Sequence, residues 1–328
     1  MKALAVLCLA LSLAVSAEEG GIQAAGWSAA GKYLVTIGGH RRLRVHDGAS
    51  GKLLRAVRVP GDPGVYVSFS PDSGHDEENV VSTLAVSGDC ALTGSTDHNL
   101  HWWTLPQLKN PVSAQSSYGL VGIALAAEGK LASCTSTSTR YLDSELSLLR
   151  WTEQGVSGGS FSELPPPDSS SSFGVVRFSP DGHWAMGYTG SGVQLWNLAE
   201  AKTPSQIFQG IYSSALALGN AHFFTRVPDG LSMRSYLLPD QEVRRFRCPD
   251  GSPWVDAGET RLLLTNSQEI WSWDLAAPNT PRKWAKKSLA ATISPDLRRA
   301  ALWQKTALEV WDLPTSKMLY KLSLKGKL

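Results

Sequence analysis

The sequence has little that would connect it to a metal cluster, a bound cofactor or a polyanion. Its 328 residues include only 4 cysteines, with no CxxC or paired Cys/His spacing. This disfavours structural zinc, attached c-type haem and a disulfide framework. The 31 basic residues nearly balance the 29 acidic ones, so no net field attracts nucleic acid or an anionic membrane. Short basic runs such as Arg244-Arg245, and Arg282-Lys283 with Lys286-Lys287, are interpreted as solvated faces. We therefore expect no cofactor and no nucleic-acid partner.

Familiar catalytic motifs are missing as well. The sequence contains no GxSxG nucleophile elbow, no HExxH, no Gly-rich phosphate loop and no recognisable Cys/His dyad. Active sites can also be assembled from scattered loop residues, so these absences make an enzyme the less favoured interpretation without excluding one.

The chain lacks a long apolar run, and its longest one lies at the N-terminus. Lys2 precedes Ala3 to Val15, and at about thirteen residues this run is too short for a bilayer, which needs roughly 20. Val15-Ser16-Ala17 supplies the small residues that signal peptidase requires. We predict that residues 1–17 are a cleaved signal peptide, and that the mature protein is periplasmic or secreted without a membrane span. The sequence leaves open whether any of the remaining cysteines, Cys90, Cys134 and Cys248, pair.

A pair of residues, aliphatic and then aromatic three positions later, recurs along the whole chain. Its clearest unit runs from Leu92 to Trp103 as a strand, a polar turn and a second strand ending in Trp. The seven aromatic positions are His46, Trp103, Trp151, Trp196, Tyr236, Trp273 and Trp311. They are 57, 48, 45, 40, 37 and 38 residues apart, close to the roughly 40 to 45 residues of four-stranded propeller repeats.

A turn rich in Gly, Pro, Asp or Asn comes 14 to 22 residues before each aromatic position. These turns lie at Gly31, Gly88, Gly129, Asp181-Gly182, Gly219-Asn220, Gly258 and Pro295-Asp296. We predict that they join the innermost strand of each blade to the next one out. The two markers together predict an all-β, seven-bladed β-propeller with four antiparallel strands per blade, in one domain over residues 18–328. An eighth turn marker, Phe69-Ser70-Pro71-Asp72, is interpreted as an insertion; a degenerate eighth blade, and ring closure through a shared blade, stay open.

Two literal WD dipeptides, Trp273-Asp274 and Trp311-Asp312, end strands of this pattern, and His46-Asp47 departs from it by one residue. On these residues the chain resembles the WD-repeat β-propeller family, in a bacterial-type exported form. Members of that family bury a hydrogen-bonded network of His, Ser or Thr, Asp and Trp. The resemblance implies such a network in the second blade, formed by His75, Thr93 or Ser95, Asp97 and Trp103. The other blades lack the full set, and we expect apolar packing to hold them.

Two long insertions, roughly Pro60 to Ser82 and Ser157 to Phe173, precede blades in this scheme. Loops of such length in compact domains are usually functional or disordered. We predict that they lie on one face and include docking residues, namely Asp72, His75, Glu78, Pro166 and Asp168. Together with the resemblance, this favours a monomeric, non-catalytic protein-protein interaction scaffold in the cell envelope.

An acidic and histidine-containing cluster supports an alternative function. Carboxylates and imidazoles that converge at the central opening suit a divalent metal with open positions, as in a metal-dependent hydrolase or lactonase. The candidate ligands are His75, Asp76, Glu77, Asp97 and His98. Their spacing matches no metal motif, and a structural bond between His75 and Asp97 beside solvated acids explains the same residues. The enzyme therefore stays the second hypothesis.

Overall fold

The structure is a computed structural model that describes residues 22–38, 41–60, 83–94, 99–115, 119–126, 129–137, 144–152, 155–157, 173–189, 192–198, 206–209, 216–277 and 281–324. Regular structure in these ranges is almost entirely β-strand, apart from the short 3₁₀ helix η1 (Ala29–Gly31). Within them, no helix has the length and apolar character needed to cross a membrane.

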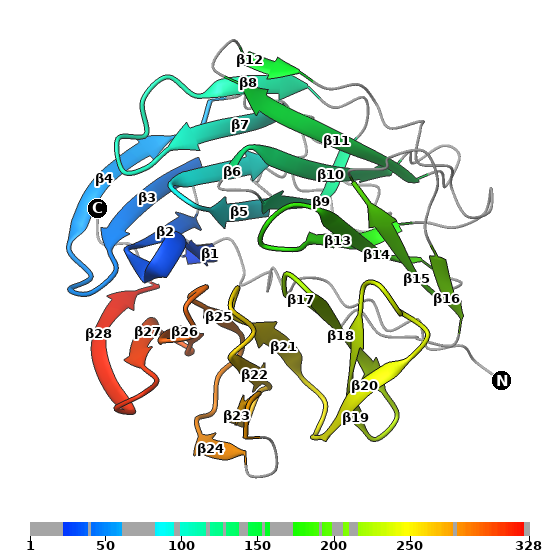
Figure 1. Ribbon diagram of the computed structural model, residues 1–328. Coiled ribbons are helices and arrows are strands. Elements are labelled where there is room, and N and C mark those ends of the chain that lie inside the picture. The colour runs from blue at the N-terminus through cyan, green and yellow to red at the C-terminus, as the bar shows by residue number, and fades with distance from the viewer. Residues whose placement is uncertain are drawn as a thin grey trace, which may run out of the picture.

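The strands β1 to β28 pair into antiparallel sheets of four, and each sheet uses four consecutive strands of the chain (Figure 1). The pairing gives seven such sheets, which we number as blades 1 to 7 in chain order. Blade 1 contains β1 (Ile22–Trp27), β2 (Tyr33–Gly38), β3 (Arg42–Asp47) and β4 (Leu53–Arg58). Blade 2 contains β5 (Thr83–Ser87), β6 (Cys90–Gly94), β7 (Asn99–Thr104) and β8 (Val112–Gln115). Blade 3 contains β9 (Gly119–Ala126), β10 (Leu131–Thr137), β11 (Ser144–Thr152) and β12 (Gly155–Ser157).

The remaining blades repeat this order. Blade 4 contains β13 (Phe173–Phe178), β14 (Trp184–Thr189), β15 (Gly192–Asn197) and β16 (Gln206–Gln209). Blade 5 contains β17 (Leu216–Leu218), β18 (His222–Val227), β19 (Gly230–Ser235) and β20 (Glu242–Arg247). Blade 6 contains β21 (Ser252–Val255), β22 (Arg261–Thr265), β23 (Glu269–Asp274) and β24 (Arg282–Ala285). Blade 7 contains β25 (Ala291–Ile293), β26 (Arg299–Trp303), β27 (Ala307–Asp312) and β28 (Lys317–Ser323).

The first strand of each blade lies innermost, and contacts between first strands connect neighbouring blades from blade 1 to blade 6 (Figure 1). Strand β1 contacts both β5 and β25, so blade 7 meets blade 1 and the ring closes. Because β25 to β28 all come from the C-terminal end, the ring closes by contact and not through a shared blade. The prediction of an all-β propeller with four antiparallel strands per blade is confirmed. The eighth turn marker lies outside the described residues.

Apolar side chains fill the spaces between neighbouring blades. Six buried clusters lie between blades 1 and 2, 2 and 3, 4 and 5, 5 and 6, 6 and 7, and 7 and 1. The side chains between blades 3 and 4 fall largely outside the described set. Each cluster draws on second and third strands. The second strands are buried along most of their length, which explains their near-continuous apolar sequences. Burial of apolar area therefore joins the blades as well as forming each one.

The predicted aromatic positions fall on or just after the third strands. Trp103, Trp196 and Trp273 are each at most 3% exposed, as expected for residues that pack between blades. Tyr236 lies one residue beyond β19 and is also buried. Trp311 differs, because it is only half-buried and lies at the outer side of the space between blades 6 and 7. The side chain of Trp151 is outside the described set.

The turns between the first and second strands lie where the sequence predicts, and a buried serine closes several of them. Ser28, Ser179 and Ser294 are fully buried. The hydroxyl oxygen of each accepts the backbone N–H five residues later, at 2.8, 3.0 and 2.9 Å. Asp256 does the same in blade 6, at 2.7 Å from the amide of Arg261. A Ser or Asp here satisfies a backbone donor that the tight turn leaves without a ladder partner.

The aspartate of the WD dipeptide has a local role. Asp47, Asp274 and Asp312 each accept a backbone N–H from the turn that follows the third strand, at 2.8, 2.9 and 3.0 Å. Hydrogen bonds from the hydroxyl and backbone of Ser50 hold the pKa of Asp47 below its usual value. The dipeptide thus combines a packing residue with a turn-forming one.

Two of the three cysteines that follow the predicted signal peptide are described. Cys90 and Cys248 are both free thiols, and burial raises the pKa of each. The side chain of Cys134 is outside the described set.

Candidate interaction face

The turns between first and second strands share one face of the propeller, because every blade runs outward in the same strand order. We call this the turn face. Hydrogen bonds connect adjacent turns across it: the amide of Ala29 donates to the carbonyl of Gly88 at 3.2 Å, from blade 1 to blade 2. The guanidinium of Arg299 in blade 7 donates to the carbonyl of Gly31 in blade 1. The face is therefore held across the closing point of the ring.

Blade 2 is connected to blade 3 by an indole. Trp102 Nε1 donates to the carbonyl of Gly129 at 2.9 Å. Gly129 has φ of +87°, and a Cβ there would lie 2.3 Å from the Cβ of Cys90. Only glycine fits this backbone conformation and this close approach.

Asn220 bridges three blades. Its Oδ1 accepts the amide of Asp181 in blade 4 at 3.2 Å, and its Nδ2 donates to the carbonyl of Ala257 in blade 6 at 3.1 Å. One side chain on the turn of blade 5 thus fixes the turns on both sides of it.

Glu259 of blade 6 closes the turn of blade 5, which has no serine of its own at the equivalent position. Its Oε1 accepts the amides of Ala221 and His222 at 2.5 and 3.0 Å, while Oε2 lies 2.5 Å from His222 Nδ1. The carboxylate fits because Gly219 has no side chain, since a Cβ there would lie 2.3 Å from Oε1. Its side chain is only 12% exposed, which strengthens these charge-assisted bonds.

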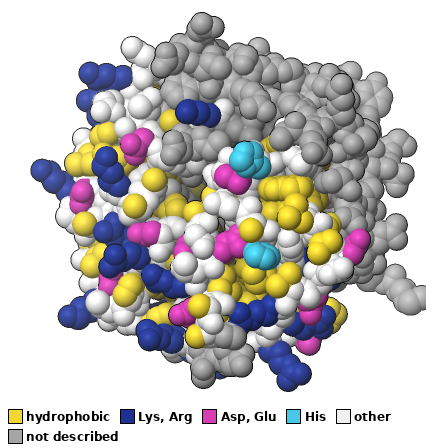
Figure 2. Space-filling view, in the orientation of Figure 1, with side chains coloured by type: hydrophobic (Ala, Val, Ile, Leu, Met, Phe, Trp, Pro, Cys, Tyr) yellow, Lys and Arg dark blue, Asp and Glu magenta, His cyan; other side chains and the backbone are white. Residues whose placement is uncertain are grey.

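A second histidine–carboxylate pair lies in blade 4. His183 Nδ1 is 3.0 Å from Asp181 Oδ2. Burial alone raises the pKa of Asp181, but hydrogen bonds from Ser179 and His183 outweigh it, so that the pKa lies below its usual value. Of the described histidines, His46 and His101 are buried, whereas His183 and His222 each lie beside an acidic group. Histidine and acidic side chains lie side by side on the face drawn in Figure 2.

An aromatic stack lies between these two pairs. Trp184 of blade 4 stacks on Tyr236 of blade 5 with ring centroids 4.7 Å apart and planes 5° from parallel. The Tyr236 hydroxyl donates to the carbonyl of Gly219 at 3.0 Å. Burial, and then the charges of Glu259 and Asp181, raise the pKa of Tyr236, so this hydroxyl stays a proton donor.

Two leucines follow Tyr236 and point away from the core. Leu237 is 84% exposed and Leu238 is 56% exposed, in the turn between β19 and β20. This turn is on the turn face, because it follows a third strand that runs toward that face. Blade 5 therefore presents two adjacent large apolar side chains to solvent beside a rigid aromatic stack.

The predicted metal ligands, network partners and docking residues His75, Asp76, Glu77, Glu78, Ser95, Asp97, His98, Asp72, Pro166 and Asp168 lie outside the described residues. Among the residues that are described, no group of three or more His, Cys, Asp or Glu side chains is arranged to hold a metal ion. The nearby His101 is buried, with its Nδ1 2.8 Å from the hydroxyl of Ser113.

Two members of the network predicted for blade 2, Thr93 and Trp103, are described, and they are hydrogen-bonded to each other. Trp103 Nε1 donates to Thr93 Oγ1 at 3.0 Å, so Thr93 is a hydrogen-bond partner of the indole. Blade 1 has a similar pair that the sequence analysis missed, with Thr36 Oγ1 3.4 Å from His46 Nε2. The signal was available, because in both blades a threonine stands ten residues before the aromatic position.

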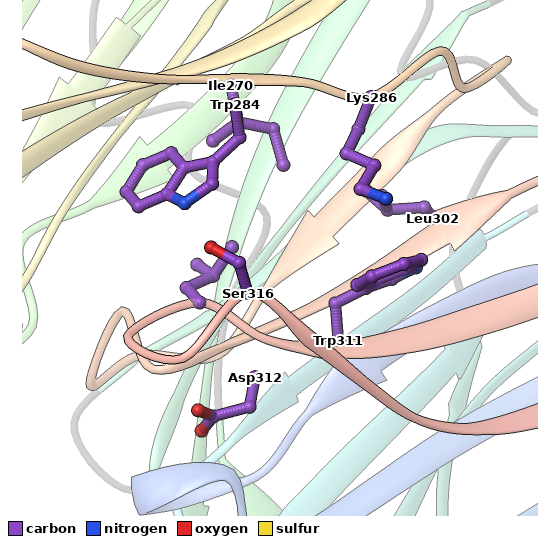
Figure 3. A pocket seen from close by; sticks show the side chains of 8 residues that line it. Ile270, Trp284, Lys286, Leu302, Trp311, Asp312 and Ser316 are labelled. Carbon is purple, nitrogen blue, oxygen red and sulfur yellow. The ribbon is translucent and has the colours of Figure 1, made fainter.

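A hollow between blades 6 and 7 was also missed. Trp284, Lys286, Trp311 and Ser316 lie around its mouth, with Ile270 and Leu302 deeper (Figure 3). Lys283 and Lys286 are not simply the solvated charges that the sequence predicts. Their ammonium groups lie 3.8 Å from the ring centroid of Trp271 and 3.6 Å from that of Trp311.

Comparison with known proteins identifies the fold. No model of a protein family and no curated protein matches the sequence. Among solved structures, the chain is similar to the β-propeller domain of Myceliophteria thermophila Cps50 (Swd1), with a TM-score of 0.57, 13% identity, and coverage of 92% of this chain and 96% of that one. It is also similar to the Neurospora crassa Pan2 WD40 domain, with a TM-score of 0.60, 11% identity and 86% of each chain covered. At this level of identity the similarity shows a WD40-type propeller fold and nothing about activity.

Proposed function

We propose that this protein is a non-catalytic scaffold that binds a protein partner on the surface of its WD40-type propeller. The observation that carries the proposal is the group of exposed apolar side chains on blade 5, Leu237, Leu238 and Val243, which are 84%, 56% and 55% exposed. Leu237 and Leu238 are neighbours in the chain, and exposed apolar side chains that lie next to one another mark interaction sites on soluble proteins.

Backbone irregularities in the fourth strands support the same function. In blades 1, 5 and 7 the pairing of the third and fourth strands shifts by one residue, and the extra residue is Leu54, Val243 or Leu319. All three are exposed. A β-bulge redirects a side chain and interrupts the strand edge, so each of these blades turns an apolar residue outward from its fourth strand.

The hydrogen bonds across the turn face make this surface a rigid support. Glu259 and Asn220 fix the turns of blades 4, 5 and 6 relative to one another. A partner that docks beside them meets a preorganised surface and loses little affinity to ordering it.

The setting is proposed on sequence grounds. Residues 1–17 are removed on export, the mature chain of residues 18–328 folds as one domain, and it acts as a monomer in the periplasm or outside the cell. Mass spectrometry of the mature protein should find Glu18 at its N-terminus, and light scattering should give the mass of one chain. A retained Met1 in the extracted protein would contradict the export step.

The test of the scaffold function is site-specific crosslinking. A photo-reactive residue at Leu237 on the turn face is compared with one at Lys305, an exposed position between β26 and β27. We expect adducts with a defined protein from position 237 and not from position 305, and we expect Leu237→Ser with Leu238→Ser to abolish capture by the intact chain. The matched control is Leu289→Ser, another exposed leucine. Adducts from neither position, or capture unchanged by the double substitution, would contradict this surface.

The hydrolase alternative has its own test. Tight, stoichiometric binding of a divalent ion that is lost in Asp97→Ala and His75→Ala variants would support it against the scaffold function.

A further inference from the structure

Two half-buried indoles, Trp284 and Trp311, line the hollow between blades 6 and 7 (Figure 3). Trp284 comes from β24, the fourth strand of blade 6, and Trp311 from β27 of blade 7. With Lys286 in place, the hollow has a cavity volume of about 10 Å³, about enough for one water molecule. An apolar side chain can therefore enter only as Lys286 moves away.

Lys286 reaches over this hollow from the segment that follows β24. Its Nζ lies 3.6 Å from the ring centroid of Trp311, and Figure 3 shows it directed toward the indole face. A lysine in this position is held by a cation–π attraction, which is weak where the ring is partly exposed. A stronger electrostatic partner can draw Lys286 off and uncover the ring.

The strand beside the hollow is an edge with one sign of charge. Strand β24 pairs only with β23, so one of its sides has no strand partner. Arg282, Lys283 and Lys287 on and after it are exposed, and residues 281–287 include no acidic side chain. Exposed backbone groups and cations therefore run side by side along one rim of blade 6.

The nearby carboxylates already have partners. Asp312 accepts the amide and hydroxyl of Thr315 at 3.0 and 2.5 Å, and Glu269 accepts the indole Nε1 of Trp271 at 2.7 Å. In the part of the chain that the structure describes, neither carboxylate forms an ion pair with a lysine or arginine of residues 281–287. The positive charge along β24 is thus available to an external anion.

We propose that β24 and the adjacent hollow bind an extended, acidic segment of a protein partner. The segment adds to the free side of β24 through backbone hydrogen bonds. Its carboxylates pair with Lys283, Lys286 and Lys287, and one apolar side chain enters the hollow as Lys286 leaves the face of Trp311. This inference rests on the proposed scaffold function and adds the chemistry of the ligand.

The arrangement favours a peptide over a nucleic acid or a lipid surface. A strand edge offers alternating N–H and C=O groups, which pair with a polypeptide backbone and not with phosphates. The wall of the hollow is formed largely by apolar side chains, among them Ile270 and Leu302, which suit an apolar side chain and not a phosphate. Lysines also appear on edge strands simply to prevent aggregation, so the test needs a second basic edge strand as a control. Strand β4 of blade 1, with the exposed Arg55 and Arg58, provides it.

The experiment measures fluorescence anisotropy of a labelled synthetic peptide of glutamates with one central leucine. The full mature chain is compared with Lys283→Glu/Lys287→Glu and with the control Arg55→Glu/Arg58→Glu, each checked for folding by circular dichroism. We expect the first pair to weaken binding at least about tenfold and the control pair to leave it within about twofold. Replacing the leucine of the peptide by serine should also weaken binding, and binding should change the tryptophan emission.

Several results would overturn the inference. One is an equal loss of peptide affinity in the Lys283→Glu/Lys287→Glu variant and in the control variant. Another is equal affinity of the native chain for the leucine peptide and the serine peptide. A third is binding of single-stranded DNA or anionic phospholipid vesicles that depends on Lys283 and Lys287 in the same way. If the glutamate peptide does not bind but position 237 still crosslinks to a protein, this site is rejected and the scaffold function stays intact. Peptide binding without any adduct at position 237 would retain this site and reject the blade 5 surface.

Discussion

Thr93 on β6 accepts a hydrogen bond from the indole Nε1 of Trp103 on β7 at 3.0 Å, with both residues buried. Thr93→Val keeps the shape of the side chain and leaves the indole N–H without this partner. We expect the free energy of unfolding to fall by about 1 to 3 kcal/mol, measured by urea denaturation. Thr93→Ser keeps the hydroxyl and should lose less. Equal stability of the valine variant and the native protein would show that the bond contributes nothing.

The glycine that begins β19 should tolerate no side chain. Gly230 has φ of +153°, and a Cβ there would lie 1.9 Å from the carbonyl oxygen of Phe246. Gly230→Ala must therefore move β20 away from β19, and we expect a loss of about 3 kcal/mol or more in the free energy of unfolding. Gly258 is the matched control, because a Cβ there would meet no atom closer than 3.7 Å. Gly258→Ala should change stability by no more than about 0.5 kcal/mol; similar losses in both variants would contradict the steric argument.

The bond from Glu259 to the turn of blade 5 should matter more than an ion pair on an outer strand. Glu259→Gln keeps one acceptor oxygen but weakens the three contacts with Ala221 and His222. We expect a loss of about 1 to 2 kcal/mol, with faster amide hydrogen exchange at Ala221 and His222. The control is Glu242→Gln, which breaks the exposed pair with Arg245 and should cost no more than about 1 kcal/mol. Unchanged exchange at the two amides would show that Glu259 does not hold this turn.

The blade architecture could be predicted from the sequence because two local markers, the aromatic position and the turn before it, recur once in every blade. Residues such as Trp196 and Trp273 must pack between blades, and turns such as Asp181-Gly182 must reverse the chain, so both follow the repeat. The pair of Thr36 and His46 was accessible too, from its match to the spacing of Thr93 and Trp103.

Features formed between blades were not accessible in this way. Trp284 lies in a fourth strand, outside the aromatic pattern, and only the packing of blade 6 on blade 7 brings it near Trp311. Glu259 replaces a missing turn residue of the preceding blade, 37 or 38 positions away. Such pairs depend on how whole blades are placed side by side, which no local spacing encodes.

His46 should make stability depend on pH in the range near neutrality. Burial holds its pKa below the ordinary value of 6.5, although the Gly51 carbonyl raises it in part. The folded state therefore favours neutral imidazole, while the unfolded chain takes up a proton near 6.5, so this stabilisation is present above that pH and is lost as the pH falls through the folded pKa. We expect the free energy of unfolding to fall from about pH 8 to about pH 5, and to fall less steeply in His46→Gln. The lowered pKa values of Asp47 and Glu242 act below this range, because their ordinary values are 3.8 and 4.5. Parallel profiles for the native protein and His46→Gln would show that His46 is not the group responsible.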